Sequence, residues 1–207
     1  CLLKSRAIRN PTETRDFDLL ETLLWEKGQG YYLMDYHLAR LNSSAQYFDF
    51  SVDEVQVTQA LDDLANDLST QSDDNQRVRL TVGTTGQVHI ETQPLEQSIE
   101  PIAPAKVRFG KIPIDSSSPF YYHKTTHRQM YEDQKQQQAE CFDVLLWNEN
   151  NEVTEFTIAN FVLELDGSHY TPPISTGLLN GTYRQHLLDQ GQLQERVIYK
   201  SELNEES

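Results

Sequence analysis

One stretch of this sequence says more about the fold than any other: Tyr122-His123-Lys124-Thr125-Thr126-His127-Arg128. Two later stretches accompany it, Val153-Thr154-Glu155-Phe156-Thr157 and Leu178-Leu179-Asn180-Gly181-Thr182. In chain order they supply a lysine, a carboxylate beside a predicted strand, and a glycine at a predicted helix start. A lysine amine can bond covalently to a carbonyl group, and backbone N–H groups at a helix start can bind an anion.

Each stretch on its own has an ordinary explanation. A lysine beside a Ser- and Pro-containing loop is usually solvated. A Thr-Glu pair next to a strand is usually a surface turn, and Leu-Asn-Gly-Thr usually does no more than begin a helix. The order and spacing of the three stretches therefore carry the interpretation.

That order and spacing resemble the class IV aminotransferase family, the fold-type IV pyridoxal phosphate enzymes. Two earlier stretches match it as well, Phe17-Asp18-Leu19-Leu20-Glu21-Thr22-Leu23 and His37-Leu38-Ala39-Arg40-Leu41. Within the family the sequence is most similar to aminodeoxychorismate lyases, in the form fused behind aminodeoxychorismate synthase component I. The resemblance implies an α/β (α+β) fold with a small N-terminal α+β domain and a C-terminal pseudo-barrel domain. It also implies pyridoxal 5'-phosphate in the cleft between the domains, and a homodimer.

The resemblance assigns roles to several residues. Lys124 would bind the cofactor covalently and then move protons, and Glu155 would keep the pyridine nitrogen protonated. The cofactor phosphate would bind the guanidinium of Arg40 and the backbone N–H groups of Gly181 and Thr182. Thr157 would also contact the cofactor.

The sequence departs from the family pattern at the helix start. Many relatives have proline where Asn180 stands, and broader members of the family have threonine where Tyr183 stands. Backbone donors survive both changes, so we expect no role for the Tyr183 hydroxyl.

Other residues are weaker candidates. Thr22 would face the substrate and help in catalysis, although an ordinary strand threonine is an equally good reading. Arg79, Arg108 and Arg128 are candidates for binding a substrate carboxylate. The six histidines show no metal-ligand spacing, so we expect no metal.

The resemblance implies a lyase that converts 4-amino-4-deoxychorismate to 4-aminobenzoate and pyruvate in folate synthesis. Two alternatives stay open: a branched-chain or D-amino-acid aminotransferase with the same site, and a non-catalytic relative that scaffolds a synthase. The second is favoured by the short stretch after Glu202, because lyase relatives usually continue with an Asn-Ser motif beside the phosphate.

Composition excludes several other classes. The 207 residues carry 17 Lys and Arg against 32 Asp and Glu, a net charge of −15, which repels nucleic acid and anionic membranes. Apolar runs are too short to span a bilayer. Two cysteines, Cys1 and Cys141, and no visible signal peptide are typical of a cytoplasmic protein. We expect a small-molecule substrate, and a synthase is a candidate partner.

The chain divides into a tail or linker (1–15), the small domain (16–93), an interdomain linker (94–104) and the larger cofactor-binding domain (105–207). We predict a strand over 17–25, a helix from a cap at Asp35 to Phe48, and a second helix after a capping box of Ser51 and Glu54. The remaining predicted elements are a hairpin of 78–82 with 87–90, a helix from 124 to about 139, strands over 142–147 and 160–165, and a helix over 182–188.

Overall fold

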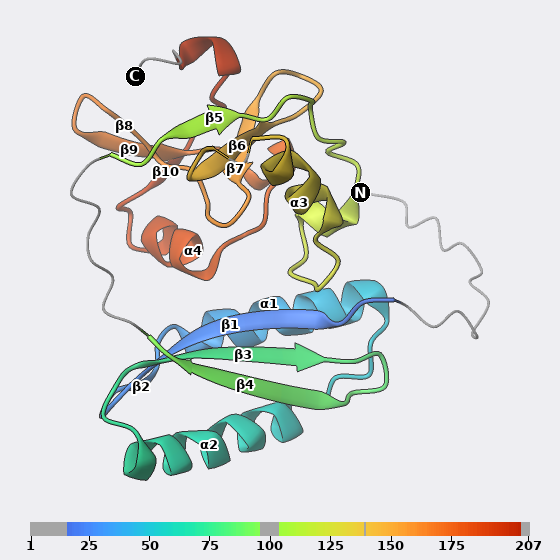
Figure 1. Cartoon of the computed structure of the whole chain (residues 1–207), viewed down its shortest axis with the longest axis vertical. Coiled ribbons are helices and arrows are strands. Elements are labelled where there is room, and N and C mark those ends of the chain that lie inside the picture. Colours follow the sequence, from blue (N-terminus) through green and yellow to red (C-terminus); the bar gives the residue numbers. More distant parts are fainter. Residues whose placement is uncertain (1–15, 96–103, 139, 204–207) are drawn as a thin grey trace.

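The computed structural model describes residues 16–95, 104–138 and 140–203 (Figure 1). The predicted tail, residues 1–15, and most of the predicted linker, residues 94–104, lie outside the described residues. What is described forms a lower, N-terminal part and an upper, C-terminal part in Figure 1.

The N-terminal part is an antiparallel sheet with two helices. Its strands lie in the order β2-β1-β3-β4. Alternate residues of β1 and β3 point to one face, where they pack against both helices, α1 and α2, in a single apolar core. The elements are β1 (Leu19–Glu26), β2 (Gly30–Tyr31), α1 (Met34–Phe48), α2 (Glu54–Gln71), β3 (Gln76–Val82) and β4 (Val88–Pro94).

Both predicted N-caps of this part are wrong by two residues. The first helix begins at Met34, after Leu33 in the left-handed conformation, so Asp35 lies inside its first turn. The cap of α2 is Asp53, whose Oδ1 accepts the N–H groups of Val55 at 3.0 Å and Gln56 at 3.3 Å. The backbone N–H of Ser51 instead donates to Thr84 in the β3–β4 turn.

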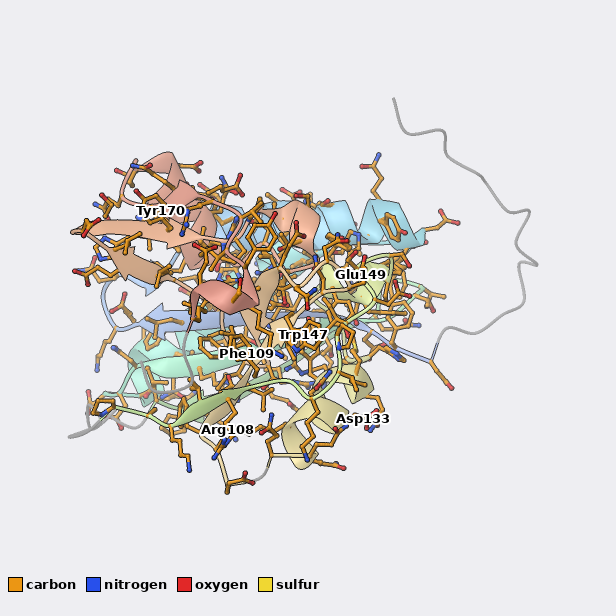
Figure 2. All side chains as sticks on the ribbon, turned by 90° about the horizontal axis from the view of Figure 1, so that it is seen from above. Arg108, Phe109, Asp133, Trp147, Glu149 and Tyr170 are labelled. Atoms are coloured by element: carbon orange, nitrogen blue, oxygen red, sulfur yellow. The ribbon has the colours of Figure 1, made fainter. Side chains whose placement is uncertain are left out.

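The C-terminal part contains two three-stranded sheets, in the orders β5-β6-β7 and β10-β9-β8. Pairs β5/β6 and β9/β10 are parallel. Phe109 and Trp147 mark β5 and β6 in Figure 2, and the Lys200 amine lies over both rings. The elements are β5 (Val107–Phe109), η1 (Pro119–Tyr121), α3 (Gln129–Gln136), β6 (Asp143–Trp147), β7 (Val153–Phe156), β8 (Leu163–Leu165), β9 (Ser168–Thr171), η2 (Ile174–Thr176), α4 (Thr182–Asp189), β10 (Gln194–Glu195) and η3 (Lys200–Glu202).

The segment around Lys124 is not helical, contrary to the prediction, because it pairs with the start of β1. The N–H of Leu20 donates to the Lys124 carbonyl at 3.0 Å, and the N–H of Thr126 donates to the Asp18 carbonyl at 2.9 Å. The Thr126 hydroxyl accepts the Asp18 N–H at 2.9 Å. The N-terminal sheet thus fixes the position of a loop that belongs to the C-terminal part.

The predicted strand over 160–165 is also shorter in the structure. Asn160 forms an isolated bridge with Glu155, and β8 begins only at Leu163. The turn between them places the Asn160 side chain beside Glu155, which matters for the site described below.

A second junction joins α1 to α4, which lies above the left end of α1 in Figure 1. Tyr36 donates to the Asp189 carboxylate at 2.8 Å, and Arg40 donates to the Asn180 carbonyl at 3.1 Å. Within the described residues, every helix is too short or too polar to cross a lipid bilayer.

Candidate active site

Lys124 lies in an enclosed position between the two parts of the chain. Burial, with a further contribution from the nearby positive charge of Arg40, lowers the pKa of Lys124 to about 8. Among the described residues its amine has no hydrogen-bond or ion-pair partner. At pH 7 roughly one such amine in ten is neutral, against fewer than about one in a thousand for an ordinary lysine, so Lys124 is suited to act as a nucleophile or base.

Glu155, on β7, is a buried carboxylate with only 4% of its surface exposed. Tyr131 donates to its Oε1 at 2.8 Å, and the Asn160 amide lies 3.3 Å from its Oε2. Burial raises the pKa of Glu155 to about 8, although Tyr131 and the charges of Lys124 and Arg128 act in the opposite direction. A protonated ring nitrogen of a bound ligand, placed beside this carboxylate, would stabilise its ionised form.

Arg40, on α1, points toward the start of α4. Its guanidinium donates to both oxygens of Glu21, at 2.9 Å and 2.6 Å, and to the Asn180 carbonyl at 3.1 Å. His37, one turn earlier on α1, contacts the same carboxylate at 2.7 Å through Nδ1. Thr182, the first residue of α4, lies 3.4 Å from the other ring nitrogen of His37.

Gly181 immediately precedes α4 and lies against Asn160. A Cβ built on Gly181 would stand 1.9 Å from Asn160 Oδ1, a distance that no side chain tolerates. Asn160 in turn donates to the Leu179 carbonyl at 2.8 Å and contacts Glu155. The start of α4 and the Glu155 carboxylate are therefore held together by a close approach that only glycine allows.

Two neighbouring cavities share the His123 side chain. The narrower, about 10 Å³, is lined by Lys124, Arg128, Tyr131 and Leu179 among others. The wider, about 230 Å³, is lined by residues from both parts of the chain, including Arg40, Asn180 and Thr182. A cation and a helix start thus face the wider space, while the lysine faces the narrower one.

Of the three arginines expected to bind a substrate carboxylate, the structure brings Arg128 to the site. Its Nη2 donates to the Thr157 carbonyl at 2.7 Å, and its guanidinium lies over the Tyr131 ring. Arg79 pairs with Glu91 at 3.2 Å. Arg108 is labelled on β5 in Figure 2, and its side chain is 42% exposed and lies 3.9 Å from Glu140.

The two threonine candidates, Thr22 and Thr157, lie in other surroundings than Lys124 and Glu155. Thr22 pairs with Arg79 across β1 and β3, on the sheet face opposite Glu21 and the two helices. The hydroxyl of Thr157 hydrogen-bonds the Asp143 carboxylate within the C-terminal part. Roles for Thr22 in catalysis and for Thr157 in cofactor binding remain predictions.

Sequence reasoning gave no role to four residues that the structure places in this cluster: Glu21, His37, Tyr131 and Asn160. One signal was available for Glu21, because Leu19, Leu23 and Trp25 on the same face of β1 are core residues. A carboxylate at a core position needs a partner.

The residues present fit pyridoxal phosphate. Within the described residues, the site holds a largely enclosed lysine without a hydrogen-bond partner, a buried carboxylate with a raised pKa, and a guanidinium beside a glycine-dependent helix start, which are the groups that this cofactor requires. In the part of the chain that the structure describes, no cluster of three or more His, Cys, Asp or Glu side chains could hold a metal ion. Such a fold and such a set of residues are typical of a pyridoxal phosphate enzyme.

Comparisons with known proteins identify the family. The model of the family "Amino-transferase class IV" matches residues 18–207, and the chain belongs to this family. A Schizosaccharomyces pombe protein named "Putative aminodeoxychorismate lyase" is 32% identical over 184 residues, which cover 86% of this chain and 76% of that protein.

Solved structures agree. A Mesorhizobium loti structure described as a "Putative amino-acid aminotransferase" is 32% identical, with a TM-score of 0.82 over 92% of this chain and 91% of its own. A Mycobacterium tuberculosis "hypothetical aminotransferase" in a "PLP-bound form" is 18% identical, with a TM-score of 0.77 over 89% of this chain and 72% of its own, and shows similarity of fold alone. The family, the fold class and the dependence of this enzyme class on pyridoxal phosphate, all expected from the sequence, are confirmed.

Proposed function

We propose that this protein is an aminodeoxychorismate lyase, which converts 4-amino-4-deoxychorismate to 4-aminobenzoate and pyruvate in folate synthesis. The observation that carries the proposal is the placement of Lys124 beside the buried Glu155, with Arg40 and the start of α4 at the adjoining cavity. The 32% identity to the fission yeast protein supports the lyase in particular.

Bound pyridoxal phosphate would supply an electron-accepting ring that stabilises negative charge next to the substrate nitrogen. Glu155 would hold the proton on the ring nitrogen, and Arg40 with the N–H groups of Gly181 and Thr182 would hold the phosphate. Lys124 would hold the cofactor covalently until substrate arrives.

Lys124 would then act as the base and the acid of the reaction. With its pKa near 8, it can remove the proton from the ring carbon that bears the amine at neutral pH. It would return a proton to the methylene of the enolpyruvyl group as pyruvate leaves. We assign the substrate carboxylate to Arg128, because Arg128 lines the same cavity as Lys124.

Covalent trapping tests the site. Borohydride reduction of the purified protein with pyridoxal phosphate, followed by peptide mapping, should place the adduct on Lys124. The variant Lys124→Ala should give no adduct. The control Lys135→Ala should label normally, because that amine donates to the Cys141 carbonyl instead. An adduct on another lysine in the wild-type protein would refute the assignment.

A class IV aminotransferase is the second candidate, since the Mesorhizobium loti structure carries an aminotransferase name at the same identity. It would use the same residues and need a keto acid to complete its cycle. If the protein binds no cofactor at all, it is a non-catalytic scaffold and neither of the two enzymes.

We further propose that the protein works as a homodimer in the cytoplasm, with aminodeoxychorismate synthase as a candidate partner. Family membership supports the dimer. The net charge of −15 supports a small-molecule substrate held by local cations rather than a nucleic-acid partner.

A further inference from the structure

Glu21 is a buried charge for which the roles above give no account. Its side chain is 1% exposed and is hydrogen-bonded by Arg40 through two nitrogens and by His37 through Nδ1. Burial raises the pKa of Glu21, but the hydrogen bonds and charges of Arg40 and His37 outweigh burial, so its pKa lies below the usual value. Glu21 is therefore a carboxylate held by two side chains one helical turn apart.

Glu21 determines which donors of Arg40 are left for an anion. A guanidinium has five N–H donors. Glu21 takes the Nε donor and one on Nη2, and the Asn180 carbonyl takes one on Nη1. Among the described contacts, one donor then remains on each terminal nitrogen, and both can donate to a phosphate.

Glu21 also reaches the start of α4 through His37. Nδ1 of His37 lies 2.7 Å from the Glu21 carboxylate, and Nε2 of the same ring lies 3.4 Å from the Thr182 hydroxyl. The hydroxyl can donate to Nε2 of a neutral ring or accept from Nε2 of a protonated one. One carboxylate thus orients the guanidinium and, through the ring, the first residue of α4.

We propose that Glu21 is the positioning residue of the phosphate site, acting through Arg40 and His37. This role rests on the proposed function, because it concerns the anion that the function requires. A carboxylate this close to a phosphate also repels it, so electrostatics alone predicts that removal of the Glu21 charge tightens phosphate binding. If Glu21 instead acts by positioning Arg40 and His37, removal of its charge weakens phosphate binding.

The test measures binding to the cofactor-free protein by calorimetry, with inorganic phosphate and pyridoxine 5'-phosphate as probes. Neither probe has an aldehyde, so neither can bond to Lys124, and the readout is independent of activity. Two variants are compared: Glu21→Gln keeps the shape and loses the charge, whereas Glu21→Asp keeps the charge and shortens the reach. Glu202→Gln is the matched control, since it loses a carboxylate–arginine contact in η3, far from α1 in Figure 1.

Both Glu21 variants should bind both probes about tenfold more weakly or worse, the scale seen when a residue that orients a ligand-binding side chain is removed. Glu202→Gln should bind them as the wild type does. Undiminished or tighter binding by the Glu21 variants would overturn the positioning role of Glu21 and leave the proposed function standing. If Glu21→Gln does not fold, the result for Glu21→Asp decides. Absence of phosphate binding in the wild type would instead overturn the anion site and the proposed function with it.

Discussion

Lys124 and Glu155 are perturbed in opposite directions by the same cause. Burial disfavours the charged form of each, so the pKa of the amine falls and that of the carboxyl rises, both to about 8. Two buried ionisable groups cost the folded protein stability unless a ligand compensates them. A ring carrying an aldehyde for the lysine and a basic nitrogen for the carboxylate would compensate both.

This cost should be measurable at Glu155 in the cofactor-free protein. Because the folded-state pKa of Glu155 lies near 8 and the ordinary value is 4.5, stability is fully present below about pH 4.5 and falls as the pH rises toward 8. The variant Glu155→Gln should therefore melt close to the wild type at pH 4.5 and above it at pH 8.5. Thermal unfolding followed by circular dichroism measures both.

Glu149→Gln is the control for that experiment. A hydrogen bond from the Ser116 hydroxyl lowers the pKa of exposed Glu149, so this variant should show no gain at high pH. A difference between Glu155→Gln and the wild type that does not change with pH would show that the Glu155 carboxyl is not perturbed.

At the scale of elements, the start of α4 depends on Gly181. In Gly181→Ala the new Cβ would collide with Asn160, which must then leave the Leu179 carbonyl and Glu155. We expect a loss of about 1–3 kcal/mol in the free energy of unfolding, as for other overpacked sites, and weaker binding of pyridoxal phosphate. Denaturant titration and a cofactor-binding titration measure the two effects.

Gly83→Ala is the matched control, because its Cβ would crowd the end of the exposed Gln87 side chain, which can move, and would touch Asp18 Oδ1 at an ordinary contact distance of 3.7 Å. It should change cofactor binding little. Wild-type affinity in Gly181→Ala would show that the contact between α4 and Asn160 does not shape the site.

Apolar runs, helical spacing and capping residues predicted the first strand, the two helices and the hairpin of the N-terminal part, because these signals are local in the sequence. These signals failed around Lys124. The sequence there is compatible with a helix, but its backbone instead forms hydrogen bonds with the start of β1, more than a hundred residues away. They also missed Tyr131, which reaches Glu155 from α3, and Asn160, whose contact with Glu155 depends on the turn that follows β7 where a strand was predicted. Local sequence carries little information about such tertiary contacts.

On the scale of the whole molecule, the candidate site lies where the two parts of the chain meet. The N-terminal part contributes Arg40 and Glu21 and holds the Lys124 loop through β1, while the C-terminal part contributes Lys124, Glu155 and α4. The acidic chain has a net charge of −15, yet Arg40, Arg128 and Lys124 gather at this junction. A local cluster of cations can bind an anionic cofactor and substrate despite the overall charge.

The most direct test of the lyase function is a turnover count without a keto acid. A lyase releases pyruvate and 4-aminobenzoate and is ready for another substrate, whereas an aminotransferase leaves its cofactor in the amine form after one cycle. The pyridoxal phosphate-loaded protein, given 4-amino-4-deoxychorismate alone, should therefore release many equivalents of pyruvate per enzyme, and Lys124→Ala should release none. Amino transfer that requires a keto acid, with no pyruvate from 4-amino-4-deoxychorismate, would contradict the lyase function and establish the aminotransferase in its place.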